Sequence, residues 1–177
     1  MTFTVHQTIE KRGTERDRLG VFPVESRAYR ESYAGTGYYF WHDSLDLAHW
    51  WGNVRYLGVG LEYSILEAQL HTKTEVFDLV GNPQHHRLIK RYQKDRRMQG
   101  ATLGTLLNFL IGLDELSQQD IFPYRVIKLV DNLRDNTWDG EMIKLGENHG
   151  GMDLSPMLII CVKDLELVSL NKRKVVF

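Results

Sequence analysis

Residues 32–52 read SYAGTGYYFWHDSLDLAHWWG, and this stretch decides the fold predicted for the chain. Its Gly-Thr-Gly at 35–37 is typical of a turn, because glycine adopts backbone conformations that other residues avoid. The Tyr-Tyr-Phe-Trp run at 38–41 predicts a strand, in which Tyr39 and Trp41 point to one face and their neighbours to the other. One pair is expected to fill a core while the other lines a pocket. Such aromatic density beside glycines favours a wall that binds a flat ring.

A short helix is predicted directly after this strand. Ser44 is a suitable N-cap, and Gly52-Asn53 is expected to end the helix. Its buried stripe is expected at three spaced positions, Leu45, Ala48 and Trp51. Trp50 and Trp51 cannot both be buried on one face, since neighbours differ by about 100° around the helix axis. Trp50 is therefore either half-covered or part of a surface for a ligand or partner.

Hydrophobic periodicity predicts further elements on both sides of this stretch. Strands are expected at residues 2–8, 54–63, 75–80, 157–163, 165–170 and 174–177, and helices at 85–98 and 102–116. Residues 126–133 fit a helix or a strand equally well. Because strands and helices do not alternate regularly, a doubly wound parallel sheet is disfavoured. We expect an α+β fold that forms a single domain over residues 1–177.

Composition excludes several classes of protein. The 177 residues are 42% hydrophobic and 25% charged, which is typical of a globular domain. A net charge of -1 argues against a generally basic nucleic-acid binder. The single cysteine, Cys161, excludes a disulfide framework. The sequence contains no apolar run of about 18 residues and no signal-peptide layout at its start, so we expect a cytoplasmic protein without a membrane partner.

Few polar motifs suggest chemistry on their own. His6, at the end of the first predicted strand, is either an ordinary core or surface histidine or a hydrogen-bond donor to a ribose hydroxyl. The adjacent His85 and His86 cannot readily chelate one ion, and no spacing of cysteine or carboxylate supports them, so no metal site is predicted. The basic segment 87–97 is either a solvated helix face or a contact for phosphates.

Taken together, these stretches resemble the ADP-ribosyltransferase superfamily, on the diphtheria-toxin and poly(ADP-ribose) polymerase side. Val-His-Gln-Thr at 5–8 is similar to the family's His-Gly-Thr, and Gly-Thr-Gly-Tyr-Tyr-Phe at 35–40 is similar to its Gly-x-Gly-(Ile/Phe)-Tyr-Phe block. Leu-Ala-His-Trp at 47–50 looks like the helix that carries the family's stacking aromatic. Met-Leu-Ile-Ile-Cys-Val-Lys-Asp at 157–164 is similar to its late strand.

The resemblance implies a split antiparallel β core of ADP-ribosyltransferase type with a central helical insertion, and NAD⁺ as ligand. By this likeness His6 binds one of the two riboses, while Tyr39 and Trp50 sandwich the nicotinamide. The implied NAD⁺-binding positions share the two motifs and the following helix: His6, Gln7, Thr8, Gly37, Tyr39 and Trp50.

Three positions depart from the family pattern. Gln7 replaces the usual glycine, Leu47 stands where a serine is often found, and Ile159 occupies the expected place of a late Glu or Gln. A carboxylate there would stabilise the oxocarbenium-like state as nicotinamide leaves. Glu147, beside a Gly-rich loop, is the first choice for that charge, and Glu141 the second. The alternatives are a different register of the late strand or impaired catalysis.

The sequence therefore predicts an NAD⁺-dependent ADP-ribosyltransferase, a glycosyltransferase, or an NAD⁺ glycohydrolase. The resemblance includes toxin-type members, which implies an antitoxin or inhibitor protein as a partner besides an unknown protein or nucleic-acid acceptor. The alternative is a non-catalytic nucleotide- or protein-binding module on the same scaffold. A third hypothesis is an RNA-modifying or RNA-binding protein that uses the basic segment 87–97.

Overall fold

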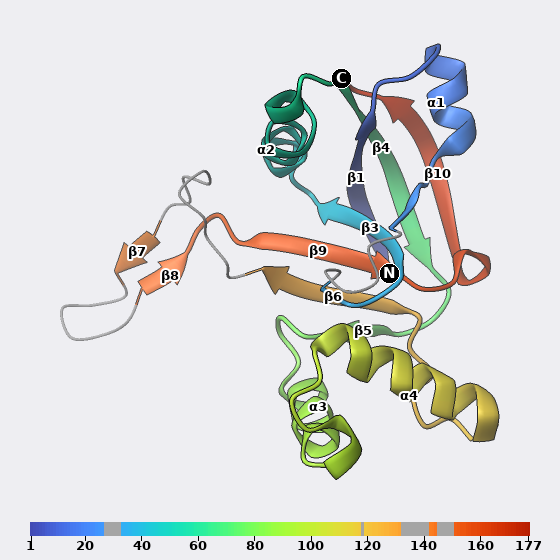
Figure 1. Cartoon of the computed structure of the whole chain (residues 1–177), viewed down its shortest axis with the longest axis vertical. Helices are drawn as coiled ribbons and strands as arrows, with labels where there is room; N and C mark the ends of the chain where they lie inside the picture. The colour runs from blue at the N-terminus through green and yellow to red at the C-terminus, as the bar shows by residue number, and fades with distance from the viewer. Residues whose placement is uncertain (27–32, 118, 132–141, 145–150) are drawn as a thin grey trace.

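The strand predicted from the Tyr-Tyr-Phe-Trp run is β3 (Gly37–His42), which lies inside the main sheet of the computed structural model (Figure 1). The structure describes residues 1–26, 33–117, 119–131, 142–144 and 151–177. Eight strands form the sheet, in the order β10-β4-β1-β3-β9-β6-β5, with β2 also paired to β3. The described pairings are antiparallel except that of β5 with β6. This is a mixed α+β fold, as predicted.

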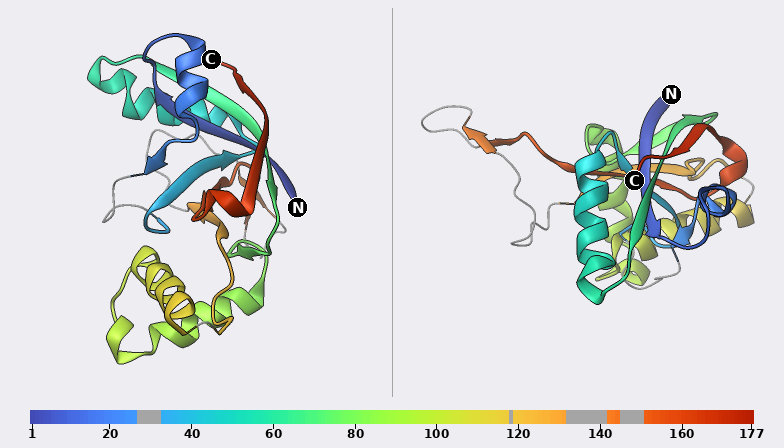
Figure 2. Two further views of the ribbon diagram at one scale, coloured as in Figure 1. Left: turned by 90° about the vertical axis from the view of Figure 1, so that its right-hand side faces the viewer. Right: turned by 90° about the horizontal axis from the view of Figure 1, so that it is seen from above.

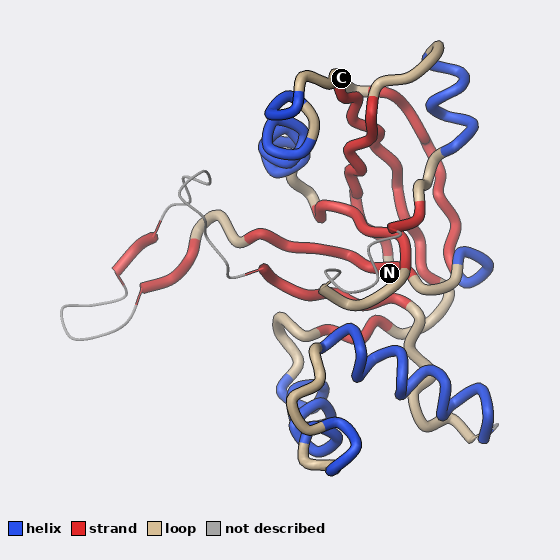
Figure 3. The backbone as a smooth tube through the Cα atoms, viewed as in Figure 1, coloured by secondary structure: helices blue, strands red, loops and turns tan. Residues whose placement is uncertain are grey.

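Figure 3 separates the strands from the helices along the chain. The other strands of the main sheet are β1 (Thr2–Glu10), β2 (Glu25–Ser26), β4 (Tyr63–Thr72), β5 (Val76–Asp78), β6 (Val126–Asp131), β9 (Met157–Val162) and β10 (Val168–Val175). A separate pair consists of β7 (Met142–Lys144) and β8 (Gly151–Asp153). The α-helices are α1 (Glu15–Val21), α2 (Leu45–Arg55), α3 (Pro83–Gln93) and α4 (Leu103–Ser117). Short 3-10 turns cover Leu57–Val59, Arg96–Met98 and Leu165–Leu167.

The sheet opens between β1 and β3. These strands are paired only at Val5 with His42 and at His6 with Trp41. At the other end of β3, the same edge pairs instead with the two-residue strand β2. In Figure 1 the strands β10, β4 and β1 run across the direction of β3, β9 and β6. The sheet therefore has two differently oriented halves that meet where β1 leaves β3.

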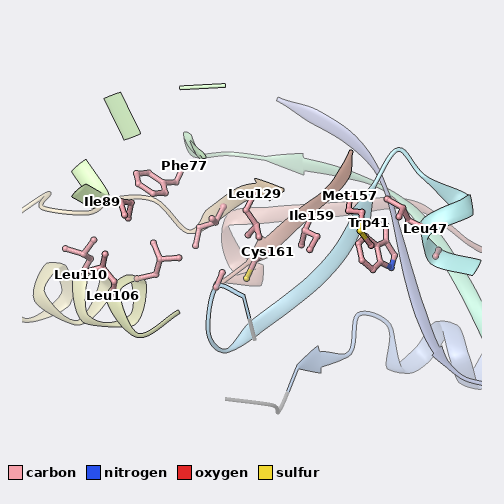
Figure 4. Close-up of a cluster of buried hydrophobic side chains, with 14 of the residues drawn as sticks. Trp41, Leu47, Phe77, Ile89, Leu106, Leu110, Leu129, Met157, Ile159 and Cys161 are labelled. Carbon is pink, nitrogen blue, oxygen red and sulfur yellow. The ribbon is translucent and has the colours of Figure 1, made fainter. Parts of the chain in front are cut away.

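Each face of the sheet has its own core. On one face Trp41, Ile159 and Cys161 are buried with side chains from α2, α3 and α4 (Figure 4). On the other face Phe40 and Ile160 are buried with apolar residues of β1, β4 and β10. The predicted alternation of β3 is confirmed, but both aromatic pairs contribute to a core. Figure 2 shows α1 and α2 at one end of the sheet, and α3 and α4 at the other.

Two predictions about the region after β3 are wrong. The helix does not end at Gly52-Asn53 but continues to Arg55. Gly52 leaves room for the Tyr63 ring, since a Cβ at this position would lie 2.4 Å from that ring. Residues 54–63 are not a strand. They finish α2 and form a 3-10 turn that ends at Gly60 in the left-handed conformation.

The buried stripe of α2 also differs from its prediction. Leu45 is exposed, whereas Leu47, Ala48 and Gly52 are buried. The Ser44 cap is confirmed, since its hydroxyl accepts from the backbone N–H of Leu47.

Later elements mostly follow the sequence pattern. The predicted strand at 157–163 is β9, between β3 and β6, and the helix at 102–116 is α4. The ambiguous segment 126–133 contains the strand β6, and the expected helix 85–98 is divided into α3 and a 3-10 turn. Residues 165–167 form a 3-10 turn before β10. Within the described residues, we find no helix long and apolar enough to cross a membrane.

Candidate functional site

His6 lies in β1, with Glu67 of β4 opposite on one side and Trp41 of β3 on the other. Its side chain is buried, and its Nε2 atom lies 3.2 Å from Oε2 of Glu67. An ionised carboxylate only accepts hydrogen bonds, so the Nε2–H donates to it. The other ring nitrogen, Nδ1, is buried and has no hydrogen-bond partner among the residues that the structure describes. Buried polar atoms are nearly always paired, and among the described residues three other buried side-chain atoms share this condition: Arg18 Nε, His42 Nδ1 and Ser64 Oγ.

Glu67 keeps the His6 ring in this orientation. Its second oxygen, Oε1, lies 2.8 Å from Nζ of Lys174 in β10. The hydrogen bonds from Lys174 and then from His6 hold the pKa of the Glu67 carboxyl below its usual value, against an opposing effect of burial. Sequence reasoning missed this residue. The available signal was one carboxylate inside the apolar run 63–70, YSILEAQL, but its pairing with His6 spans 61 positions of the chain.

Gln7 faces the opposite side of the sheet from His6 and fills the opening between β1 and β3. Its Nε2 donates to the carbonyl oxygens of Val24, at 2.8 Å, and Tyr39, at 3.2 Å. Its Oε1 accepts from the backbone N–H of Val24 at 2.8 Å. The Gln7 amide thus links β1 to Val24 and to Tyr39 of β3, beyond the point where the backbone pairing of β1 with β3 ends. In this structure Gln7 has an architectural role that a glycine lacks.

Thr8 and Gly37 hold the surrounding elements together. The Thr8 hydroxyl donates to the Ala48 carbonyl at 2.7 Å, which fixes α2 against β1. Gly37 has a φ of 155°, and a Cβ there would lie 2.8 Å from the Val162 carbonyl oxygen and 2.9 Å from Sγ of Cys161. Only a residue without a side chain allows β3 and β9 to approach this closely.

Tyr39 lies on the same sheet face as His6 and is half-buried. Its hydroxyl oxygen accepts from the backbone N–H of Ala34 at 2.9 Å, and the hydroxyl donates to the Gly35 carbonyl at 2.5 Å. The hydroxyl thereby fixes the turn that precedes its own strand. The Tyr39 hydroxyl is therefore a structural group of the protein.

Lys163 fixes the same turn from the next strand. Its ammonium group donates to the carbonyl oxygens of Ala34 and Thr36 and to Oδ1 of Asn108 in α4. Burial lowers the pKa of Lys163, and burial raises the pKa of its neighbour Cys161 to about 11. At neutral pH Cys161 is therefore a protonated core residue and not a nucleophile.

Trp50 extends from α2 over the strand face that carries His6. Its ring meets that of Trp41 edge to face, with centroids 6.1 Å apart and planes at 76°. Trp50 is half-buried, whereas Trp41 is buried. Of the six implied NAD⁺-binding residues, four thus lie on the sheet face that α2 covers, namely His6, Thr8, Tyr39 and Trp50, whereas Gln7 lies on the opposite face.

Neither of the two carboxylates expected for catalysis is among the residues that the structure describes. Glu141 and Glu147 lie outside the described residues. Ile159 is 3% exposed in the core, between Trp41 of β3 and Leu129 of β6. A carboxylate that sequence reasoning missed, Asp131, ends β6 two residues beyond Leu129 on the same face. It is buried and accepts a 2.5 Å hydrogen bond from the Tyr33 hydroxyl.

A hollow of about 780 Å³ lies elsewhere, beside β5 and the start of α3. Its lining includes Thr72, Asp78 and Lys128, and none of the six implied NAD⁺-binding residues contributes to it. None of the four buried side-chain atoms without a described partner, which include His6 Nδ1, belongs to the lining of this hollow. Comparisons with protein-family models, curated proteins and solved structures found no match to this chain.

Proposed function

We propose that the protein binds NAD⁺ on the sheet face of His6, Tyr39 and Trp50 and cleaves its nicotinamide glycosidic bond. It would act as an ADP-ribosyltransferase or NAD⁺ glycohydrolase on a split antiparallel β core. The observation that carries the proposal is the buried Nδ1 of His6, which has no described partner while Glu67 holds the other nitrogen. The opening between β1 and β3 supports it, because it begins one residue beyond His6.

In this proposal Nδ1 of His6 accepts a hydrogen bond from a ribose hydroxyl. This reverses the direction expected from the sequence, because the Glu67 carboxylate takes the Nε2–H. The Trp50 and Tyr39 rings hold the nicotinamide. The bond between the ribose C1′ and the nicotinamide nitrogen breaks, and its electron pair leaves with nicotinamide. Water or an acceptor nucleophile then forms the new bond at C1′ and loses a proton.

A negative group near C1′ would stabilise the positive charge that develops in this step. Glu147 and Glu141 remain the proposed sources of that charge, and Asp131 is a third candidate on the same sheet face. The acceptor is proposed to be a protein or a nucleic acid in the cytoplasm, with an antitoxin or inhibitor protein as a further partner. These assignments rest on the sequence resemblance.

A second function is favoured by two observations. The late strand buries Ile159 where the family has an acid or amide, and the Tyr39 hydroxyl is already used within the protein. A protein with these features would bind NAD⁺ or another nucleotide without turning it over.

Release of nicotinamide from NAD⁺ by the purified protein, measured by chromatography, tests the proposal. We expect release by the wild type, loss of release in His6→Ala, and wild-type release in His71→Ala, which changes an exposed histidine of the neighbouring strand. Calorimetric binding without release would support the non-catalytic function. If the protein neither binds NAD⁺ nor releases nicotinamide, both proposed functions are contradicted.

A further inference from the structure

The helix α3 carries a stripe of positive charge. Four exposed side chains form this stripe, which we call the α3 basic stripe: Arg87, Lys90, Arg91 and Lys94. At about 100° per residue, these four positions fall within an arc of about 100°, and they extend over about 10 Å of helix axis. The opposite side of α3 is apolar: Ile89 is buried, and Leu88 and Tyr92 pack against the same core. The core contacts therefore direct the basic stripe outward.

The charge of the stripe is not neutralised locally. Within the described residues, none of its four cations forms an ion pair. The only acid of residues 82–98 is Asp95, and its carboxylate pairs with Arg97 at 2.8 Å. Six basic residues and one acid give this segment a charge of +5, against -1 for the whole chain. Positive charge is therefore concentrated in this segment.

Helix stability explains only part of this pattern. Cations near the C-terminus of a helix interact favourably with its dipole, which accounts for Lys90 and Arg91 in the last turn. Arg87 lies in the middle of the helix, outside the reach of that effect. Repulsion between like charges three and four residues apart also opposes helix formation. The helix dipole therefore does not account for the whole stripe, whereas contact with an external anionic partner would.

We propose that the α3 basic stripe binds the phosphate backbone of double-stranded DNA without reading its sequence. The exposed arc offers no aromatic ring on which the bases of a single strand would stack. Double-stranded RNA is recognised across two successive minor grooves, which a stripe of about 10 Å does not span. The major groove of B-DNA, about 12 Å wide, admits one helix, and long cationic side chains reach the phosphates on its walls.

The stripe is also remote from the proposed NAD⁺ site. Figure 2 shows α3 and α4 at the opposite end of the molecule from α2, which carries Trp50. Binding of DNA therefore does not depend on NAD⁺ chemistry, and each activity can be lost without the other.

The test measures fluorescence anisotropy of a labelled random-sequence duplex of about 20 base pairs, two helical turns, with the full chain. At about 50 mM salt we expect a dissociation constant on the order of 10⁻⁵ M or tighter, with affinity falling linearly in log–log form as salt rises. The quadruple variant should reduce the magnitude of the slope of log affinity against log salt concentration by about 3 to 4. It carries the substitutions Arg87→Gln, Lys90→Gln, Arg91→Gln and Lys94→Gln.

A matched variant removes four exposed cations from other elements: Arg16→Gln, Arg55→Gln, Lys172→Gln and Arg173→Gln. This variant has the same net charge as the quadruple variant of the stripe, but it should keep the affinity of the wild type for the duplex and the same dependence on salt. Arg87→Lys with Arg91→Lys should also keep the slope, because charge alone is required. The proposal is overturned by no duplex binding at about 50 mM salt, by equal loss in the matched variant, or by tighter binding of single-stranded RNA or phosphatidylglycerol vesicles.

Discussion

His6 and Tyr39 lie on the same face of one sheet, yet their polar atoms are used in opposite ways. The Tyr39 hydroxyl donates and accepts within the protein and, together with Lys163, fixes the turn before β3. His6 uses one ring nitrogen for Glu67 and leaves the other buried without a described partner. Tyr39 thus uses its hydroxyl for the fold, whereas His6 keeps one ring nitrogen without a described partner, and this is the atom that we propose binds the ligand.

The largest effect on stability is expected at Gly37, where β3 and β9 approach closely. A Cβ at this position would meet backbone and sulfur at 2.8 and 2.9 Å, and neither atom can move freely. Gly37→Ala should lower the free energy of unfolding by about 2 to 3 kcal/mol, measured by urea denaturation. Gly20→Ala is the control, because its Cβ would meet nothing within 4 Å in helix α1. That variant should be as stable as the wild type or up to about 1 kcal/mol more stable.

Removing the Tyr39 hydroxyl should also be costly. Tyr39→Phe leaves the Ala34 N–H and the Gly35 carbonyl without this partner and should destabilise the fold by about 2 kcal/mol. In the described structure the hydroxyl of the adjacent Tyr38 makes no hydrogen bond, so Tyr38→Phe should change stability by less than about 0.5 kcal/mol. Equal stability changes in the two variants would show that the Tyr39 hydroxyl is not a structural group.

Replacement of His6 should affect NAD⁺ binding more than the stability of the fold. His6→Ala removes the acceptor proposed for a ribose hydroxyl, so NAD⁺ affinity measured by calorimetry should fall about tenfold, or about 1.4 kcal/mol. Tyr38→Ala, on the opposite face, should leave NAD⁺ affinity unchanged. Equal loss of NAD⁺ affinity in both variants would contradict a binding site on the sheet face of His6.

The smallest effect concerns Glu67 and pH. Hydrogen bonds from Lys174 and His6 lower the pKa of this carboxyl in the folded protein from its usual 4.5. Its contribution is therefore fully present above pH 4.5 and is lost as the pH falls through the lowered folded value. Because the site is partly exposed, the effect should be below about 1 kcal/mol. Unfolding of Glu67→Gln and wild type should differ at neutral pH and converge in acid.

The sequence predicted the local parts of this architecture well. The strand β3 and the Ser44 cap follow from alternation and side-chain chemistry within a few residues. Two other features depend on contacts between residues that are distant in the chain. Gly52 is typical of a helix end in sequence, but in the structure it lies inside α2 and leaves the space that the Tyr63 ring fills. Residues 126–131 became a strand because β5 and β9 pair with them.

The candidate site was only partly predictable for the same reason. The motifs predicted His6, Tyr39 and Trp50 as site residues, and the structure places His6 and Tyr39 on one face of the sheet and Trp50 in the helix α2 that covers this face. Glu67 reaches His6 only through the pairing of β1 with β4, and Asp131 reaches this face only through the pairing of β6 with β9. Neither pairing has a local signal in the sequence.

The state of His6 Nδ1 tests the central claim most directly. Nuclear magnetic resonance of protein labelled with ¹⁵N-histidine, assigned by comparison with His6→Ala, reports both ring nitrogens and their bonding. We predict that Nε2 carries the proton shared with Glu67, and that the Nδ1 signal shifts on addition of NAD⁺ but not in Trp50→Ala at the same concentration. An Nδ1 signal that stays unchanged at saturating NAD⁺ would contradict the proposed site.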